Sequence, residues 1–162
     1  MPKLHVDYLR SIIFGFEDSL VSTTGVIAGV STGTQDPKII LLAASVTIIV
    51  EALSMGAGQF LSERAVQQME QKYDSNLIIG GSLMFVSYAA AGLIPLLPVV
   101  LLPFPNSVFA SICLAFLSLF ALGYVKGKVV GVKPVRSGLE ILLIGGVATL
   151  LGVLAGYFFR TT

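Results

Sequence analysis

The chain has 162 residues, of which 55% are hydrophobic and only 12% are charged, and its net charge is +1. Soluble domains carry about 25% charged residues, so this composition excludes a soluble globular protein and predicts an all-α integral membrane protein in contact with lipid. The net charge says nothing about nucleic acid, and because a basic stripe is absent we expect no nucleic-acid partner.

Five apolar segments are long enough to cross a bilayer, which takes about 20 residues in a helix. They make up a single transmembrane domain over residues 1–162. In chain order the predicted spans are residues 11–32, 39–62, 76–98, 107–125 and 137–159.

The connections between these spans have recognisable signals. Pro37 suits the first turn of the second helix. Residues 63–73 hold strong helix formers without Gly or Pro, so the second helix is predicted to continue into the cytoplasm. Three prolines predict a turn over residues 96–106, and glycines and a proline predict a loop over residues 127–134.

The distribution of basic residues predicts the orientation, because Lys and Arg accumulate in cytoplasmic loops. Eight of the ten basic residues lie on the side of the membrane that also holds the N-terminus, so the N-terminus is predicted to be cytoplasmic. Five spans, an odd number, then put the C-terminus on the opposite side. The eight are Lys3, Arg10, Arg64, Lys72, Lys126, Lys128, Lys133 and Arg136, and the other two are Lys38 and Arg160.

Glycines recur every fourth residue in two of the spans. Gly25, Gly29 and Gly33 lie in the first, and Gly152 and Gly156 lie in the last. Small residues at this spacing let helices approach closely in lipid. Two interpretations remain open at this point: packing within one chain, or a homodimer that meets along the first helix.

Carboxylates inside the first two spans are the main candidates for function. A charge at the centre of a membrane helix costs at least about 2.5–3.5 kcal/mol, so such residues are usually functional. Glu17 and Asp18 lie in the first span, and Glu51 lies in the second. Asp18 and Met55 are each about 10 Å from the predicted cytoplasmic end, at about 1.5 Å per residue.

A polar stripe follows one face of the second helix. Glu51, Met55, Gln59 and Glu63 recur every fourth residue. Carboxylate oxygens suit divalent cations, and a thioether favours the softer transition metals over Mg²⁺ and Ca²⁺. Carboxylates in apolar surroundings also take up protons, so such a site could exchange metal for protons.

Structural interpretations compete with these functional ones. A methionine in a membrane helix is usually a packing residue, and Met55 is as well explained by packing as by ligation. A single intramembrane carboxylate can also lock two helices by a hydrogen bond, although three in one region favour a functional site. Glu140 lies one turn after Arg136, which predicts a local ion pair.

The sequence contains no nucleophile elbow, Walker loop, CxxC pair or HExxH motif, so we expect a protein that is not an enzyme.

Four segments of the chain resemble the vacuolar iron transporter family. FGFEDSLVSTTGVIAGVSTG is similar to that family's first helix, and EALSMGAGQFLS is similar to its second-helix motif. The end of the third span and most of the fifth resemble the corresponding family helices. The segments are residues 14–33, 51–62, 91–98 and 136–156.

The resemblance implies a homodimer whose ion path lies between the two copies of the first helix. It implies export of Fe²⁺, and often Mn²⁺, from the cytosol in exchange for protons, with no permanently bound cofactor. The family's aspartate falls on Asp18, its methionine on Met55, and an acidic residue near the start of the first helix on Asp7.

The chain departs from the family pattern at several positions. Glu17 and Ser19 replace the usual neighbours of the aspartate, Glu51 replaces a small residue, and Gln59 replaces a glutamate. Iron-transporting members usually insert a Glu-rich cytoplasmic metal-binding domain between the second and third helices, whereas only residues 63–75 stand there in this chain. The resemblance is therefore to a short form of the family.

These observations together predict a divalent transition-metal transporter that moves Fe²⁺ or Mn²⁺ out of the cytosol. Asp18 and Glu51 would supply oxygen ligands and accept protons, Met55 would supply sulfur, and Glu17 would be a secondary carboxylate. The membrane would be the cell membrane in a prokaryote and the vacuolar membrane in a eukaryote. The alternatives are a non-transporting membrane protein that binds metal or a partner as a scaffold or sensor, and a passive channel.

Overall fold

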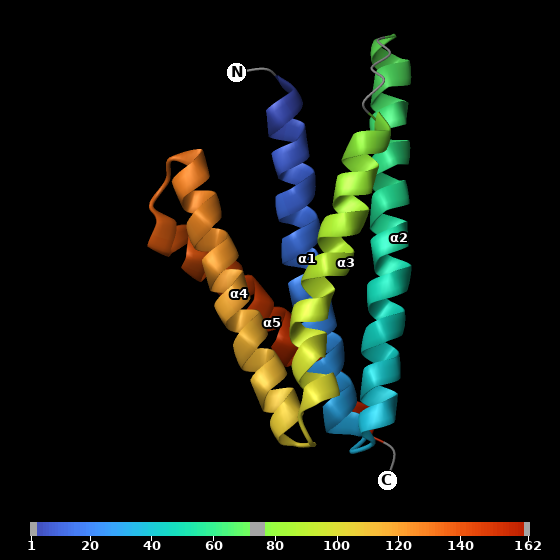
Figure 1. Cartoon of the computed structure of the whole chain (residues 1–162), viewed down its shortest axis with the longest axis vertical. Helices are drawn as coiled ribbons and strands as arrows, with labels where there is room; N and C mark the ends of the chain where they lie inside the picture. Colours follow the sequence, from blue (N-terminus) through green and yellow to red (C-terminus); the bar gives the residue numbers. More distant parts are fainter. Residues whose placement is uncertain (1–2, 72–76, 161–162) are drawn as a thin grey trace.

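The computed structural model describes residues 3–71 and 77–160, and in this part of the chain every regular element is a helix. Each of the five helices is long and apolar enough to cross a membrane, which confirms the five-span prediction. The helices are α1 (Lys3–Gly33), α2 (Pro37–Glu70), α3 (Leu77–Leu101), α4 (Asn106–Val130) and α5 (Pro134–Phe158) (Figure 1).

The second helix begins and continues as the sequence predicts. Pro37 occupies its first turn, and the Asp36 carboxylate caps it by accepting a hydrogen bond from the Lys38 backbone N–H at 2.9 Å. The helix then runs without a break to Glu70, so its predicted extension beyond the membrane span is confirmed as far as that residue. Residues 72–76, which include the rest of the predicted extension, lie outside the described residues.

Two predicted loops are shorter than expected. The turn predicted over residues 96–106 was wrong at its start, because α3 contains Pro95 and Pro98 and ends only at Leu101. Each proline removes one backbone hydrogen bond, but breaking the helix inside the membrane would leave more backbone groups unpaired. A loop was predicted over residues 127–134, but in the structure it comprises only residues 131–133, because α4 continues to Val130 and α5 begins at Pro134.

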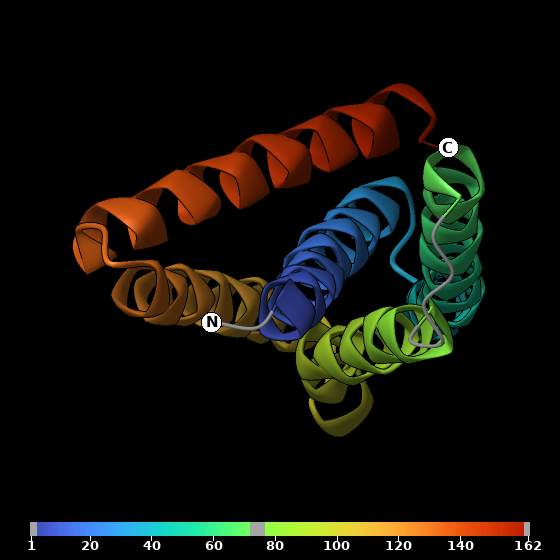
Figure 2. The same cartoon turned by 90° about the horizontal axis from the view of Figure 1, so that it is seen from above.

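Helix α1 lies at the centre of the bundle and contacts each of the other four helices (Figure 2). Among the described residues, α2 packs only on α1 and α3, and α5 packs only on α1 and α4. Within the described ranges α2 and α5 do not touch each other. One side of α1, between α2 and α5, therefore has no helix of the same chain across it.

The glycine repeats bring α1 and α5 together within one chain. A Cβ at Gly29 would lie 2.6 Å from the backbone oxygen of Gly152, and one at Gly33 would lie 3.4 Å from that of Gly156. The α4–α5 pair uses the same device, since a Cβ at Gly123 would lie 2.6 Å from the backbone oxygen of Ser137. The structure shows packing within the chain for these glycines, and the homodimer along the first helix stays a prediction.

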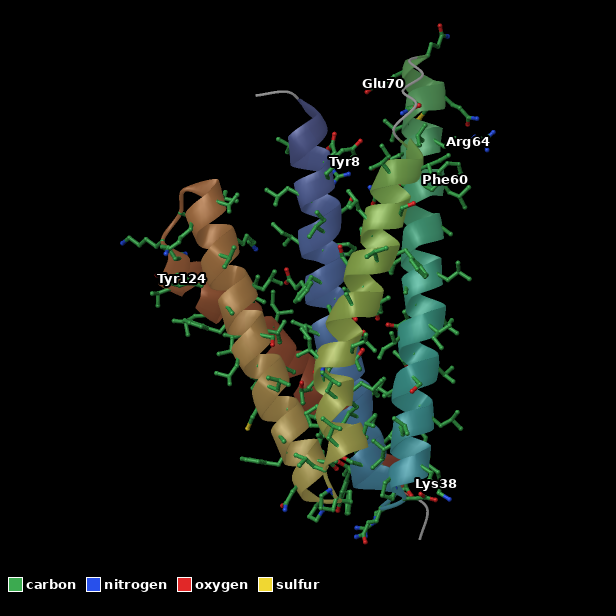
Figure 3. All side chains as sticks on the ribbon, viewed as in Figure 1. Tyr8, Lys38, Phe60, Arg64, Glu70 and Tyr124 are labelled. Atoms are coloured by element: carbon green, nitrogen blue, oxygen red, sulfur yellow. The ribbon has the colours of Figure 1, made fainter. Side chains whose placement is uncertain are left out.

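Charged side chains gather at the two ends of the bundle (Figure 3). Arg64 and Glu70 lie near the start of α1, together with Tyr8, and Lys38 lies at the opposite end. The apolar surface between them is the part that lipid would cover. Which end faces the cytosol stays a prediction from the loop charges.

Candidate functional site

Three helices meet at a polar cluster in the middle of the bundle, formed by Asp18, Ser22, Glu51 and Tyr88. Tyr88 of α3 is fully buried, and its hydroxyl donates a hydrogen bond to the Glu51 carboxylate of α2. The same hydroxyl lies 2.5 Å from the Ser22 hydroxyl of α1. Asp18 stands one turn before Ser22, close enough for its charge to interact with that of Glu51. We call these four residues the central cluster.

Small residues allow the three helices to come this close. A Cβ at Gly92 of α3 would lie 2.7 Å from the Ile48 side chain of α2 and 2.8 Å from the Ser19 hydroxyl of α1. Gly56 and Gly81 make a similar approach between α2 and α3, where a Cβ at Gly56 would lie 2.9 Å from the backbone oxygen of Gly81. The close packing places the Tyr88 ring between α1 and α2, where its hydroxyl reaches both.

Tyr88 is a candidate that the sequence analysis missed. It lies one turn before Gly92 in a strongly apolar helix, where a buried tyrosine hydroxyl needs a hydrogen-bond partner. This need for a hydrogen-bond partner is the feature of the sequence that could have identified Tyr88 as a candidate. Its partners could not be named from the sequence, because Ser22 and Glu51 are 66 and 37 residues away along the chain.

Glu17 lies beside the central cluster and has a different neighbour. Its half-buried carboxylate interacts with the charge of Lys126 on α4 as well as with that of Asp18. Consecutive residues on a helix point about 100° apart, so Glu17 and Asp18 serve different faces of α1. The secondary role predicted for Glu17 is consistent with this position.

The remaining predicted residues lie toward the end of the bundle where α1 begins. Gln59 donates a hydrogen bond to the Glu63 carboxylate, which lies against Gly80 of α3. Glu63 is twelve residues from Glu51, about 18 Å along the helix at 1.5 Å per residue. Asp7 is exposed near the start of α1.

Met55 stands between these two groups. It lies one turn after Glu51 and one turn before Gln59, and its side chain is half-buried. Met55 therefore lies on the polar face of α2 between Glu51 and Gln59, as the spacing predicts.

The seven predicted residues do not form one preassembled site. Within residues 3–71 and 77–160, no three side chains of His, Cys, Asp or Glu gather closely enough to hold a metal ion. The central cluster brings Asp18 and Glu51 together, while Glu63 and Asp7 lie apart from it. A single chain thus offers two carboxylates, two hydroxyls and a nearby thioether at the middle of its spans.

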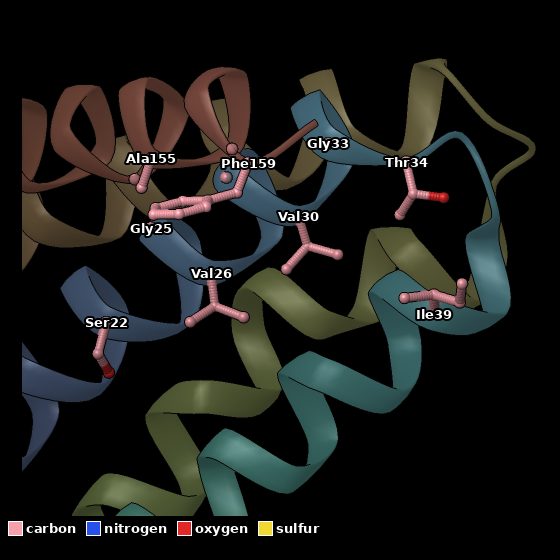
Figure 4. A pocket seen from close by; sticks show the side chains of 12 residues that line it. Ser22, Gly25, Val26, Val30, Gly33, Thr34, Ile39, Ala155 and Phe159 are labelled. Carbon is pink, nitrogen blue, oxygen red and sulfur yellow. The ribbon is translucent and has the colours of Figure 1, made fainter. Parts of the chain in front are cut away.

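A hollow of 660 Å³ runs along the side of α1 that faces the gap between α2 and α5 (Figure 4). Ser22 belongs both to its lining and to the central cluster, so the hollow borders the cluster at this residue. Its lining is mostly apolar and comes from Ser22, Gly25, Val26, Gly29, Val30, Gly33, Thr34, Ile39, Gly152, Ala155, Gly156 and Phe159.

The sequence is similar to known vacuolar iron transporters. Over 65 residues, 40% of this chain, it is 42% identical to vacuolar iron transporter 1 of Arabidopsis thaliana, but the match covers only 26% of that protein. A vacuolar iron transporter of Centaurea cyanus is 24% identical over 204 positions, which cover 87% of this chain and 83% of the relative. Vacuolar iron transporter homolog 4 of Arabidopsis thaliana is 28% identical over 86% of this chain and 77% of its own length.

The alignments also indicate where the chain is short. The 204 positions aligned with the Centaurea cyanus protein exceed the 162 residues of this chain, so that relative has residues without a counterpart here.

The VIT family model matches residues 9–77 and 74–157, in two pieces that meet at the connection between α2 and α3. Because these matches cover nearly the whole bundle, the chain belongs to the VIT family.

Proposed function

We propose that this protein moves a divalent transition metal, Fe²⁺ or Mn²⁺, out of the cytosol in exchange for protons. The observation that carries the proposal is the central cluster, in which the carboxylates of Asp18 and Glu51 come together from two helices inside the membrane spans. Two neighbouring carboxylates in apolar surroundings need a counter-charge, and a divalent cation or protons can supply it.

Exchange follows from this need for a counter-charge. A metal ion binds ionised carboxylates, so its arrival displaces protons and protonation releases it. Tyr88 donates a hydrogen bond to Glu51, and this bond would hold the carboxylate in place while metal and protons alternate. The cluster thereby favours alternating occupation by metal and by protons, as an exchanger requires.

The other predicted residues suggest the direction of approach. Glu63 and Asp7 lie toward the end of the bundle that the basic loops predict to be cytoplasmic, where their carboxylates can attract cations. Met55 and Gln59 stand between that end and Glu51 along one face of α2. Since the Glu-rich inserted domain of longer members has no counterpart here, we propose that these residues replace it in capturing the metal.

A homodimer would complete the site. One chain offers only two carboxylates at the central cluster, whereas Fe²⁺ and Mn²⁺ commonly take several oxygen or nitrogen ligands. A second copy placed against the uncovered side of α1 would double these ligands and fill the apolar hollow. Such a dimer would meet along the hollow beside Ser22 and Val26, whose lining also includes the glycines at which α1 packs on α5.

The proposed function also suggests which cellular membrane holds the protein. Several relatives carry the word vacuolar in their names, which supports a vacuolar membrane if the organism has one. In a prokaryote the corresponding site is the cell membrane, with export out of the cell.

Purified protein in proteoliposomes tests the function. Uptake of Fe²⁺, Mn²⁺, Co²⁺, Zn²⁺ and Mg²⁺ is measured as the metal retained in the vesicles, and a pH dye inside them follows proton movement separately. Asp18→Asn removes the charge with little change in volume and should reduce transition-metal uptake to the level of empty vesicles. Asp36→Asn is the matched control, because asparagine also caps helices and Asp36 lies outside the spans.

The outcomes separate the three candidate functions. Metal uptake coupled to a change in internal pH supports exchange. Uptake without a pH change indicates a passive channel. Metal binding without any uptake indicates a scaffold or sensor and contradicts the proposal.

A further inference from the structure

A second methionine lies beside the central cluster, on the face of α3 that carries Tyr88. Met84 precedes Tyr88 by one helical turn, and its side chain is only 2% exposed. Its sulfur points at α1, because a Cβ at Gly15 would lie 3.1 Å from Met84 Sδ. The thioether therefore lies between α1 and α3 rather than in lipid.

The face of α1 that Met84 contacts also carries Asp18. Gly15, Asp18 and Ser22 follow one another at spacings of three and four residues, so they share one face of the helix. At one end of this stretch Gly15 meets Met84, and at the other end Ser22 meets Tyr88. Asp18 thus lies between two contacts that α1 makes with α3.

This arrangement brings the sulfur close to the Asp18 carboxylate. Side chains three residues apart on a helix have Cβ atoms about 5–6 Å apart, so Met84 Sδ is no more than about 9 Å from the Cβ of Asp18. A methionine side chain is unbranched and flexible, so its sulfur can move toward a ligand without a shift of the backbone. The charge of Asp18 also interacts with the hydroxyl of Tyr88, the neighbour of Met84 on α3.

Met84 and Met55 lie at one level of the bundle. Met55 follows Glu51 by one turn on α2. Met84 precedes Tyr88 by one turn on α3, and Tyr88 donates its hydrogen bond to Glu51. Because α2 and α3 run in opposite directions (Figure 1), these two steps lead toward the same end of the bundle.

A close contact between α2 and α3 supports this register. A Cβ at Gly56 would lie 2.9 Å from the Cβ of Phe85. These two residues directly follow Met55 and Met84 in the chain. Two thioethers therefore stand at one level, one turn away from the central cluster.

We propose that Met84 is a second sulfur ligand of the metal bound at the central cluster and that it makes this site prefer soft metals. The inference rests on the proposed function, because it concerns the same carboxylates. One chain would then offer two carboxylates and two thioethers, from Asp18, Glu51, Met55 and Met84. Such a set favours Fe²⁺ and softer ions over Mn²⁺ and Mg²⁺, for which oxygen ligands are more suitable.

A thioether is well suited to a place enclosed by membrane helices. It carries no charge and is only a weak hydrogen-bond acceptor, so burying it costs little free energy. A third carboxylate at the position of Met84 would need a counter-charge of its own. Met84 can thus add a ligand for metal without adding a charge to the metal-free protein.

Calorimetry of metal binding to the purified full chain in detergent tests the proposal, with Cd²⁺ as a soft probe and Mn²⁺ as a hard probe of equal charge. Met84→Leu conserves volume, so if Met84 only packs, the ratio of the two affinities should not change. Loss of a sulfur ligand should instead weaken Cd²⁺ binding at least about tenfold and change Mn²⁺ binding little.

The other sulfur-containing residues provide the controls. Every protein carries Cys113→Ser, because the exposed thiol of Cys113 would itself bind Cd²⁺. Met69→Leu is the matched control, since Met69 is 77% exposed on the extension of α2 and should leave both affinities unchanged. Met55→Leu combined with Met84→Leu should lower the ratio of Cd²⁺ to Mn²⁺ affinity further than either change alone.

Selenomethionine provides a measurement that does not depend on a Met84 variant. In a protein with Met55→Leu and Met69→Leu, Met84 and Met1 are the remaining methionines. X-ray absorption at the selenium edge should then show cadmium at bonding distance once Cd²⁺ is added.

The outcomes separate this inference from the function on which it rests. An unchanged affinity ratio in Met84→Leu, or an equal fall of both affinities, would make Met84 a packing residue and overturn the inference. Selenium without a cadmium neighbour would overturn it as well, even if Met84→Leu failed to fold. A wild type that binds neither Cd²⁺ nor Mn²⁺ would instead overturn the proposed function itself.

Discussion

The hydroxyl of Tyr88 donates a hydrogen bond to the carboxylate of Glu51, and this contact joins α3 to α2 inside the membrane spans. The same hydroxyl meets Ser22 of α1 at 2.5 Å. One buried side chain therefore ties together the three helices that carry the central cluster. If the cluster binds metal, the orientation of Glu51 depends on a residue that need not touch the metal itself.

Replacing Tyr88 by phenylalanine tests this relationship. Tyr88→Phe keeps the ring but removes the hydroxyl, so we expect the bundle to form and the Glu51 carboxylate to lose its fixed position. Loss of a hydrogen bond to a charged group is worth about 1.5–3 kcal/mol, which predicts at least a tenfold fall in metal affinity or transport. Proteoliposome uptake measures it, with Tyr124→Phe on α4 as the control. Wild-type uptake in Tyr88→Phe would show that the bond to Glu51 has no role in transport.

The role of Met55 is tested by its selectivity. Met55→Leu conserves volume but removes the thioether one turn from Glu51. Transport of Fe²⁺ and the later first-row metals should fall, while the weak response to Mg²⁺ should not change, since Mg²⁺ prefers oxygen ligands. Competition assays in proteoliposomes measure both. Equal Fe²⁺ transport in variant and wild type would make Met55 a packing residue.

Metal binding should weaken as the pH falls. Protons compete with metal for the carboxylates of Asp18 and Glu51, so acidification moves the equilibrium toward the protonated, metal-free cluster. Mn²⁺ binding measured by calorimetry across about pH 5 to 8 should show this trend, and Asp18→Asn should remove most of it. Binding that is flat with pH in the wild type would argue against carboxylate ligands.

The close approach of α1 and α5 should make Gly29 intolerant of any side chain. Gly29→Ala puts a Cβ 2.6 Å from the backbone oxygen of Gly152, and such overpacking typically costs about 1–3 kcal/mol. The unfolding temperature in detergent should fall. Gly146→Ala on α5 is the matched control, because nothing lies within 4 Å of its added Cβ. Equal stability of the two variants would contradict the observed α1–α5 packing.

The proposed dimer places the hollow between two copies of the chain. Val26 lines this hollow on α1, so Val26→Cys in a Cys113→Ser background should form a disulfide-linked dimer under mild oxidation. Leu117→Cys in the same background is the control, since Leu117 is 68% exposed on α4 and lies away from the hollow. Gel electrophoresis without reductant distinguishes them, and equal crosslinking of both would indicate random collision rather than this interface.

The amino-acid sequence alone determined the elements of this protein. Long apolar segments predicted all five helices, the Asp36-Pro37 pair predicted how α2 begins, and residues 63–73 predicted that it extends beyond its span, although it ends at Glu70. These features could be predicted because hydrophobic length, capping and helix propensity depend on residues close together in the chain. The Arg136–Glu140 pair, one turn apart, was predicted and confirmed for the same reason.

Only the tertiary structure decided which residues meet. In the structure the α1 glycines pack against α5, and Tyr88 donates a hydrogen bond to Glu51. The charge of Lys126 interacts with that of Glu17, and Glu63 lies away from the central cluster. It also showed that α3 continues past Pro98, one of the prolines that had predicted a turn. These outcomes depend on how helices far apart in the sequence pack, and the backbone's need for hydrogen bonds within lipid outweighs the local preference of a proline.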